Sequence, residues 1–377
     1  MNQTNINTSV IPDVSGDYDE LLRFENRIFK TSFTKIMPKI YRDKEKCTDS
    51  HIVIRDNGKI IAALAYYDTK LILGSEEIKA IGIGSVAVDK KYRGKGLMRT
   101  LLEEADVLAE AKGAETAILS GYRQRYSRFG FEKGGIHHTF TLSNYFFNHF
   151  RPRRKLRLQM PYSSASLLQQ CAKLYSTENC RWERKETEFS DIISTWNLDS
   201  YAVFDDSRLL GFLVCDKSEI KDFYLNNPED AAEVLYTFAK TKRRWTLNVK
   251  VTDFQKELIK ELSKISDEHK ISEDASYKIY NFEAFIRKML TYKAKQTKLI
   301  DGELTLRIDG KGIRIRYADG VPDVSGCPPQ EKADIETDAV TATRILTTGF
   351  GTEEFNNPVL NAWSPICPVS ISTIDEV

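Results

Sequence analysis

The sequence predicts an α+β (α/β) protein divided into two or three domains. Three observations lead to this prediction. The chain has 377 residues, more than one ordinary hydrophobic core accommodates. Strand-type alternation and helix-type periodicity follow one another along the whole chain. The coarse order of these patterns in the first third recurs in the middle third.

The first part begins with one or two helices over residues 16–41 and continues with three strands over residues 51–89. Turns at Asn57-Gly58 and at Gly74 separate these strands. An amphipathic helix over residues 96–113 follows, and Gly113 suits its C-terminus. A strand at 115–121, a short helix or turn at 122–130 and a last strand at 135–142 complete this part.

The composition changes near Phe150, where "FRPRRKLRLQM" predicts a domain boundary. The middle part contains helices, a hairpin and a strand but no glycine-rich basic loop. A third part contains "GELTLRIDGKGIRIRYADG", an alternating hairpin closed by "DGKG". We therefore place the domains at residues 1–149, 150–284 and 285–377.

Composition and charge exclude several classes of protein. Hydrophobic residues make up 41% of the chain and charged residues 29%, as in ordinary globular proteins. The net charge of +1 gives no overall field that would favour nucleic acid or a membrane surface. The start is polar, with no signal-peptide pattern, and no stretch approaches the roughly 18 apolar residues of a membrane span. We expect a cytoplasmic protein with neither a nucleic-acid nor a membrane partner.

Metal and disulfide signals are also weak. The six cysteines are scattered without a CxxC pair, so we expect neither a disulfide framework nor a zinc site. His137 and His138 are adjacent, and strand alternation would send them to opposite faces. We predict no metal site.

The chemistry concentrates where a strand meets a helix, at "GIGSVAVDKKYRGKGLMRT". Gly82 and Gly84 interrupt the strand and indicate a bulge or a close approach of another backbone. Gly94 and Gly96 open the loop before the helix N-terminus, where free amides and the helix dipole favour an anion. Lys91, Arg93 and Lys95 add positive charge, as a pyrophosphate site requires. A tight turn with basic residues is the alternative, and the loop is neither a Walker loop nor GxGxxG.

The stretch "GSVAVDKKYRGKGLMRTLLEEA" resembles motif A of the GNAT superfamily of N-acetyltransferases, with Lys91 where glutamine or arginine is usual. The resemblance implies acetyl-CoA as co-substrate, with its pantetheine arm in a gap between two splayed strands. The implied contacts are Val86, Ala87, Val88, Lys91, Arg93, Gly94, Lys95, Gly96, Leu97 and Met98. "YSRFGF" is similar to a further motif of this superfamily and implies Tyr126 as general acid. A packed aromatic side chain is the alternative for Tyr126.

The whole layout resembles the enhanced-intracellular-survival (Eis) acetyltransferases. This resemblance implies two tandem GNAT-like mixed-sheet domains followed by a sterol-carrier-like α/β domain. It also implies a hexamer and an acceptor amine that can be polycationic, like an aminoglycoside, or a peptide. In that group the C-terminal carboxylate is the base, here Val377, and the tail "PVSISTIDEV" is strand-like with an acidic tip. Glu25 and Glu376 are candidates for an acidic acceptor pocket, and a frayed tail is the alternative.

Two other functions fit parts of the sequence. A non-catalytic ligand- or lipid-binding protein could use the GNAT part as a scaffold, but the complete motif A and Tyr126 argue against it. An aminoacyl transferase of peptidoglycan bridges also pairs two GNAT-like domains, but it predicts neither the third domain nor so complete a motif in the first half. We therefore expect acetyl transfer from acetyl-CoA to a primary amine by direct attack.

Overall fold

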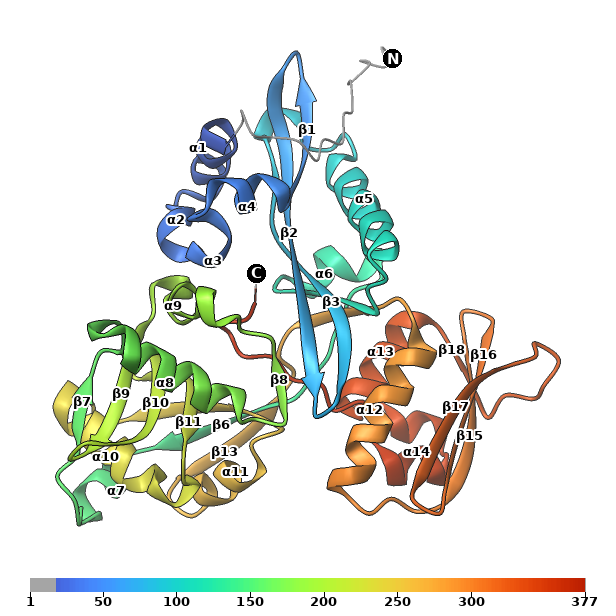
Figure 1. Ribbon diagram of the computed structural model, residues 1–377. Helices are drawn as coiled ribbons and strands as arrows, with labels where there is room; N and C mark the ends of the chain where they lie inside the picture. The colour runs from blue at the N-terminus through green and yellow to red at the C-terminus, as the bar shows by residue number, and fades with distance from the viewer. Residues whose placement is uncertain (1–17, 377) are drawn as a thin grey trace. The chain divides into compact units, whose positions relative to one another are not determined.

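The computed structural model describes residues 18–376 (Figure 1). These residues form two compact units. Unit 1 contains residues 18–134, residues 275–368 and Glu376, and unit 2 contains Gly135–Asp274 and Val369–Asp375. Each unit therefore combines segments that are far apart in the sequence.

A mixed sheet forms the first half of unit 1, with the strand order β1-β2-β3-β4-β14-β5. β3 and β4 run parallel, and the other neighbours run antiparallel. The bounds are β1 (His51–Asp56), β2 (Lys59–Leu73), β3 (Glu76–Val88), β4 (Thr116–Leu119), β5 (Glu132–Lys133) and β14 (Ser276–Ile279). Gly58 and Gly74 lie at positive φ in the first two turns, so both predicted hairpins are confirmed.

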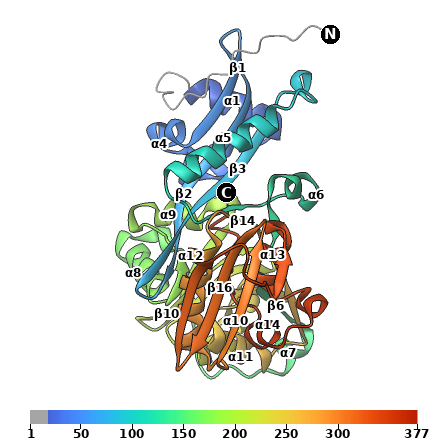
Figure 2. The ribbon, with the colours of Figure 1, turned by 90° about the vertical axis from the view of Figure 1, so that its right-hand side faces the viewer.

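Different helices cover the two faces of this sheet (Figures 1 and 2). Alternation along β1 explains the division, because neighbouring side chains point to opposite faces. Ile52 and Ile54 pack in one cluster with Leu101 of α5. Val53 packs in another with Tyr41 of α3. The helices are α1 (Tyr18–Phe29), α2 (Phe33–Ile36), α3 (Pro38–Tyr41), α4 (Lys44–Asp49) and α5 (Leu97–Ala111).

Two strands lie in sheets that the sequence does not predict for them. β6 (His137–Leu142), expected as the last strand of the first domain, pairs with β12 (Leu247–Thr252) and β13 (Glu268–Ser272) of unit 2. β14, from the segment expected in the second domain, pairs with β4 and β5 of unit 1. The predicted boundaries after residues 149 and 284 therefore do not coincide with the two compact units. The three-domain division stays a prediction.

The C-terminal part of unit 1 combines a small sheet with helices, seen in orange and red in Figure 2. Its strand order is β17-β16-β15-β18. β15 and β16 form the hairpin predicted around "DGKG", and Asp309 and Gly310 at its turn have positive φ. The elements are α12 (Phe282–Gln296), β15 (Gly302–Ile308), β16 (Lys311–Ala318), β17 (Val321–Cys327), β18 (Ile335–Thr337), α13 (Ala339–Thr348) and α14 (Pro358–Trp363).

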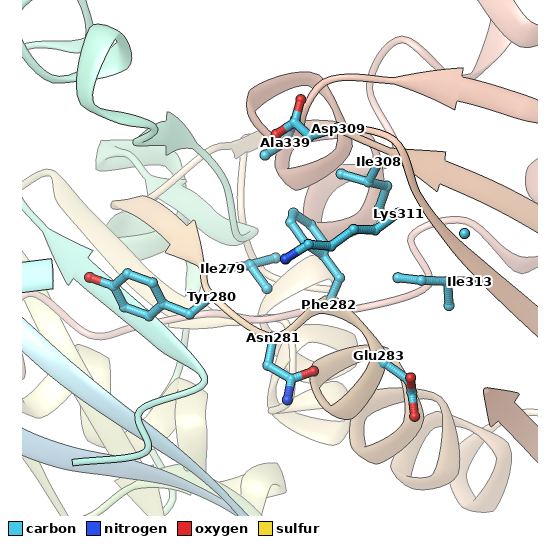
Figure 3. A pocket seen from close by; sticks show the side chains of 11 residues that line it. Ile279, Tyr280, Asn281, Phe282, Glu283, Ile308, Asp309, Lys311, Ile313 and Ala339 are labelled. Carbon is cyan, nitrogen blue, oxygen red and sulfur yellow. The ribbon is translucent and has the colours of Figure 1, made fainter. Parts of the chain in front are cut away.

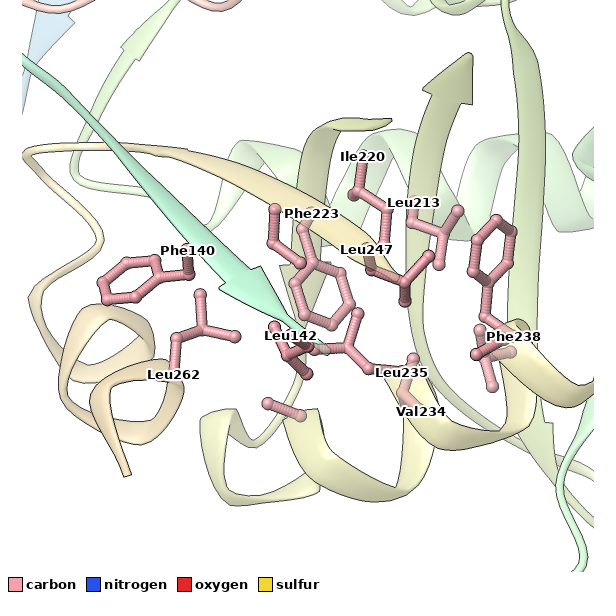
Figure 4. Packing of buried hydrophobic residues seen from close by; sticks show 14 of the residues in the cluster. Phe140, Leu142, Leu213, Ile220, Phe223, Val234, Leu235, Phe238, Leu247 and Leu262 are labelled. Carbon is pink, nitrogen blue, oxygen red and sulfur yellow. The ribbon is translucent and has the colours of Figure 1, made fainter. Parts of the chain in front are cut away.

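Unit 2 is built around a mixed sheet of order β13-β6-β12-β11-β10-β9-β7, in which β11 and β12 run parallel. On one face, Leu213 and Phe223 of the strands pack with Leu235 and Phe238 of α10 (Figure 4). A second core lies against α8 and α9. The elements are α7 (Asn144–His149), β7 (Arg157–Gln159), α8 (Ala165–Ser176), β8 (Cys180–Trp182), α9 (Phe189–Ile193), β9 (Asp199–Asp205), β10 (Arg208–Asp216), β11 (Glu219–Leu225), α10 (Ala231–Lys242) and α11 (Lys256–Ser263). None of the helices within residues 18–376 has both the length and the apolar character that a bilayer crossing needs.

Candidate active site

The turn between β3 and α5 contains the glycine-rich loop. A short 3₁₀ helix, η1 (Lys90–Tyr92), follows β3, and the Lys91 amide donates a hydrogen bond to the Asp89 carboxylate at 3.0 Å. Gly94 and Gly96 both have φ of +81°, a conformation that residues with a side chain rarely adopt. A Cβ at either position would meet nothing within 4 Å. The backbone thus requires the glycines, and the space beside them is open.

The N-terminus of α5 has no side-chain cap, because Gly96 occupies the capping position. The amides of Arg99 and Thr100 donate to the Gly96 carbonyl at 2.8 and 3.1 Å. Within the described residues, the amides of Gly96, Leu97 and Met98 have no hydrogen-bond acceptor. Free amides at the positive end of a helix dipole form an anion-binding arrangement.

Basic side chains surround this open helix end. Lys91, Arg93 and Lys95 are all exposed. The ammonium of Lys95 lies 5.0 Å from the centre of the Tyr92 ring, whose hydroxyl donates to Asp56 at 2.7 Å. The loop therefore presents positive charge and backbone donors together, which suits a phosphate group.

The edge of β3 beside this loop is not covered by β4. The two strands pair from Ala80 to Ile83 of β3, and the pairing stops there. On the other edge, Gly84 pairs with Ala65 and Ala87 with Ala63, so Ser85 and Val86 form a bulge. The glycines at positions 82 and 84 predict a bulge in this strand, and the bulge lies directly after Gly84.

The three strand residues expected at the co-substrate lie in this uncovered segment of β3. The Ala87 side chain is buried in the core against the N-terminal helices. The side chains of Val86 and Val88 are half-buried and pack against the core of α5. Because β4 does not pair with this segment, the backbone groups on this edge of β3 could pair with one more extended chain.

Tyr126 ends α6 (Arg123–Tyr126), which follows the carboxyl end of β4. Its ring packs edge-on against Phe131 at 6.4 Å and against Gly121, where a Cβ would clash with the ring. Burial raises the pKa of Tyr126 above its usual value, although the neighbouring Arg125 acts in the opposite direction. The Tyr126 hydroxyl is therefore protonated at neutral pH, as a proton donor must be.

The C-terminal tip also lies at the end of β4. The Lys39 ammonium donates to the Glu376 carbonyl at 2.6 Å, and the Ser120 hydroxyl donates to the Glu376 carboxylate. Ser120 is the first residue after β4. The tail before Glu376 forms no strand, so the strand-like expectation for it is wrong. Val377 lies outside the described residues.

Glu25 has surroundings that sequence reasoning did not anticipate. Its side chain on α1 is fully buried, and one carboxylate oxygen lies 3.5 Å from Nε2 of His51. Within residues 18–376, neither oxygen of Glu25 has a hydrogen-bond donor. Burial alone would lower the pKa of His51, but the Glu25 charge and a hydrogen bond to Cys47 raise it to about 10. The Glu25 side chain is thus buried, unlike the solvated carboxyl group that a helix usually carries.

Several of these contacts involve residues that the sequence analysis did not single out. They are Lys39, Tyr41, His51, Ser85 and Ser120. Ser85 directly follows Gly84 in the interrupted strand, and this spacing could have identified it. His51 and Lys39 carry no such signal, because their roles depend on contacts between separate elements.

A separate pocket of about 450 Å³ lies in the C-terminal part of unit 1 (Figure 3). Ile279 and Phe282 line it from the junction of β14 and α12, and Ile308 and Lys311 from the β15–β16 hairpin. Ala339 lines it at the start of α13. Its volume falls in the usual range for small-molecule sites. It contains none of the predicted site residues.

Comparison with known proteins identifies the first part of the chain. A family model described as "Acetyltransferase (GNAT) domain" matches residues 13–134. An uncharacterized N-acetyltransferase of Escherichia coli (strain K12), YhbS, is 30% identical over 127 residues. That match spans 34% of this chain and 73% of the relative.

Two solved structures resemble the whole chain. A GCN5-related N-acetyltransferase from Kribbella flavida has a TM-score of 0.72 at 14% identity, with 100% of both chains covered. Eis1 from Mycobacterium abscessus has a TM-score of 0.66 at 10% identity, with 97% of this chain and 98% of that one covered. At these identities the likeness establishes the fold, a mixed α/β architecture consistent with tandem GNAT-like domains and an additional α/β domain.

Proposed function

This chain belongs to the GNAT family of N-acetyltransferases, and from that premise we propose that it transfers an acetyl group from acetyl-CoA to a primary amine by direct attack. The observation that carries the proposal is the open, basic N-terminus of α5 beside the uncovered edge of β3. Either feature alone could be structural. Together they would supply amide donors for a pyrophosphate and a strand edge for a pantetheine arm in one continuous stretch of backbone.

The loop residues fit acetyl-CoA by their conformation and charge. The amides of Gly96, Leu97 and Met98 would hold the pyrophosphate, and Lys91, Arg93 and Lys95 would balance its charge. Gly94 would let the phosphates approach the backbone, because no side chain fills the space beside it. The backbone of Val86 to Val88 would hold the pantetheine arm. The bound group supplies the acetyl thioester.

Tyr126 would act as the general acid. A departing thiolate needs a proton, and a tyrosine that stays protonated at neutral pH can donate one. The position of Tyr126 after β4 supports this role, because the same end of β4 carries Ser120 and the chain tip.

The α-carboxylate of Val377 would accept the proton of the attacking amine. An ammonium has no lone pair, so the nitrogen must lose a proton before or during attack. The contacts of Glu376 with Lys39 and Ser120 support this role, since they fix the preceding residue at the end of β4. A carboxylate is a weak base, with a pKa of about 3.5, so the proton transfer would accompany nitrogen attack.

The acceptor would be a small, polycationic, aminoglycoside-like amine or a peptide amine. The Glu376 carboxylate is half-exposed and is the group that we propose to contact it. Glu25 exposes none of its side chain, so it would act on the acceptor through its charge rather than by direct contact. The proposed compartment is the cytoplasm, consistent with six unpaired cysteines, and the proposed assembly is a hexamer.

The alternative function is ligand binding by the C-terminal part, which we propose to be sterol-carrier-like. The pocket beside Phe282 is the observation behind this second candidate. Its walls combine apolar side chains such as Ile308 with the charged Glu283, Asp309 and Lys311. This alternative does not explain the open, basic turn before α5, because the GNAT part would then be only a scaffold.

A panel of amines with acetyl-CoA, followed by detection of free thiol, tests the proposed function. We expect amine-dependent thiol release, with polyamines and aminoglycosides included in the panel, and a thermal shift with acetyl-CoA. A thermal shift with lipids but not with acetyl-CoA, and no thiol release with any amine, would support the ligand-binding alternative instead.

A further inference from the structure

The bulge of β3 is held by a chain of side chains, of which the proposed function uses only Glu25. The bulge residue Ser85 has φ of +48°, an uncommon conformation for a residue with a side chain. The Tyr41 hydroxyl donates to the Ser85 hydroxyl at 2.7 Å. A conformation of this kind persists where its surroundings hold it, and this hydrogen bond ties Ser85 to α3.

Tyr41 is itself fixed on both sides. Its ring stacks on Phe33 with centroids 4.7 Å apart, and it meets the His51 ring at 5.2 Å. Nε2 of His51 lies 3.1 Å from the Tyr41 hydroxyl. Tyr41, His51 and Glu25 are all essentially inaccessible to solvent. Glu25, His51, Tyr41 and Ser85 are called the bulge network below.

The direction of the hydrogen bonds determines the charge of His51. Nδ1 lies 2.5 Å from the Cys47 carbonyl, which can only accept, so Nδ1 carries a hydrogen. With the Tyr41 hydroxyl donating to Ser85, its oxygen can accept from Nε2, and Glu25 acts on Tyr41 as well as on His51. Both ring nitrogens then carry hydrogens, and His51 is an imidazolium whose charge is balanced by Glu25 at 3.5 Å.

We propose that Glu25 and His51 are positioning residues that polarise Tyr41 toward Ser85 and so hold the β3 segment that receives acetyl-CoA. This inference rests on the proposed function. A neutral Glu25 would no longer balance the charge, and His51 would release the Nε2 proton. Nε2 would then attract the Tyr41 hydroxyl hydrogen, and Ser85 would lose the donor that now fixes its hydroxyl. The Glu25 side chain on α1 would thus control the backbone conformation of β3 at Ser85, directly before Val86.

The groups that face His51 support this charge state. Glu25 approaches from α1, the Tyr41 hydroxyl from α3 and the Cys47 carbonyl and thiol from α4. The acceptors hold the pKa of His51 at about 10 despite its burial. The network is therefore charged throughout the range in which the enzyme would work.

The first test measures the protonation of His51 in the unmodified protein at pH 8 by nitrogen-15 NMR of the histidine side chains. We expect two N–H hydrogens on His51 and only one in Glu25→Gln, whereas Glu25→Asp keeps the charge and should keep both. A neutral His51 in the unmodified protein at pH 8 would overturn the proposal. This measurement needs neither acetyl-CoA nor a substrate.

The second test measures acetyl-CoA affinity by calorimetry in Tyr41→Phe, with Tyr66→Phe as the matched control. Tyr66 is a buried tyrosine of β2 whose hydroxyl donates to the Asp49 carbonyl at 2.5 Å and not to a bulge residue. We expect about a tenfold loss of affinity in Tyr41→Phe, a similar loss in Ser85→Ala, no further loss in the double variant and none in Tyr66→Phe.

The two possible failures are distinguishable. Equal acetyl-CoA affinity in Tyr41→Phe and Tyr66→Phe, with binding by the unmodified protein, would overturn the positioning role and leave the proposed function intact. No binding of acetyl-CoA by the unmodified protein would overturn the proposed function and, with it, this role.

Discussion

Units 1 and 2 each contain a strand that runs beside a parallel neighbour into a helix, but the turns between strand and helix differ. In unit 1, the turn from β3 to α5 has two glycines at positive φ and exposed basic side chains. In unit 2, the turn from β11 to α10 is "NNPED", in which the Asn227 side chain accepts a hydrogen bond from the Glu229 amide and Pro228 opens a 3₁₀ turn.

Acidic side chains complete the contrast. Asp230 accepts a hydrogen bond from Arg154 at 2.7 Å, and Glu233 accepts one from the Arg153 amide at 2.8 Å. The first turn of α10 thus carries negative charge, which complements the helix dipole and repels an anion. The comparison teaches that similar strand-turn-helix geometry does not establish a similar function. We expect the residues of the turn to decide whether the helix end can receive a phosphate.

The largest expected effect is a loss of kcat when the chain end is removed. The chain end would serve the acetyl-CoA site that we propose at the turn of unit 1. Deleting Glu376 and Val377 should lower kcat by about 10³-fold, because it removes the proposed base. Acetyl-CoA affinity should change little, since the turn remains intact. Steady-state kinetics and calorimetry on the same protein check both parts. A tagged C-terminus that is as active as the native one would contradict the role of the tail.

The next largest effect concerns Tyr126. Tyr126→Phe should lower kcat by about 10²-fold through loss of the proton donor, with the fold and acetyl-CoA affinity preserved. Tyr122→Phe is a suitable control, because Tyr122 lies four residues earlier and is 74% exposed. If both variants turned over at the same rate as the unmodified enzyme, Tyr126 would be a packed aromatic side chain only.

A smaller effect on binding sharpens the account of the loop. Gly94→Val should lower acetyl-CoA affinity about tenfold, because forcing a left-handed conformation costs about 1–2 kcal/mol and the added side chain faces the phosphates. Gly58 is a matched control, with φ of +80° against +81° for Gly94 and equally open space. Both variants should lose similar stability in thermal unfolding, but only Gly94→Val should bind acetyl-CoA more weakly. Unchanged affinity in a folded Gly94→Val protein would contradict the assignment of the loop.

The smallest expected effects concern the pH dependence of stability. A histidine in each unit has a shifted pKa, and the two shifts have opposite directions. In unit 2, burial and then the charge of Lys250 lower the pKa of His137 to about 3, whereas the pKa of His51 in unit 1 is raised to about 10. His51 should therefore stabilise the protein fully below its ordinary pKa of about 6.5 and progressively less as the pH rises to about 10. The contribution of His137 has the opposite sign. It is present above pH 6.5 or so and is lost as the pH falls toward about 3.

Urea unfolding at a series of pH values checks both signs. The slope should be on the order of 1 kcal/mol for each pH unit over which one histidine titrates differently in the folded and unfolded states. Replacing His51 by glutamine should flatten the alkaline decline, and the same change at His137 should flatten the acid decline. Unaltered slopes in both variants would contradict the two assignments.

The sequence predicts local structure well and the pairing of distant segments poorly. Glycine turns and apolar alternation predict the β1–β2 and β15–β16 hairpins because the signal lies within a few residues. The alternation of β6 predicts a strand, but nothing in it specifies pairing with β12 and β13 rather than with β4. That choice depends on the packing of both units.

The candidate site shows the same limit. The β3–α5 loop could be predicted because its chemistry is contiguous: glycines, basic residues and a helix start. Glu25 could be suggested only from a family resemblance, and its partner His51 could not be found, since α1 and the start of β1 meet only in the folded protein. The expectation of a strand in the tail fails because alternation also occurs in extended chain that pairs with no sheet.

The central claim is that only the turn of unit 1 binds acetyl-CoA. Calorimetric titration of acetyl-CoA into the unmodified protein tests it most directly, because it measures how many molecules bind per chain. The account predicts one molecule of acetyl-CoA per chain, bound through the open turn of unit 1, with none bound at the acidic turn of unit 2. Two molecules per chain would show that the contrast between the turns does not decide binding. No binding at all would show that the open turn is a structural feature only.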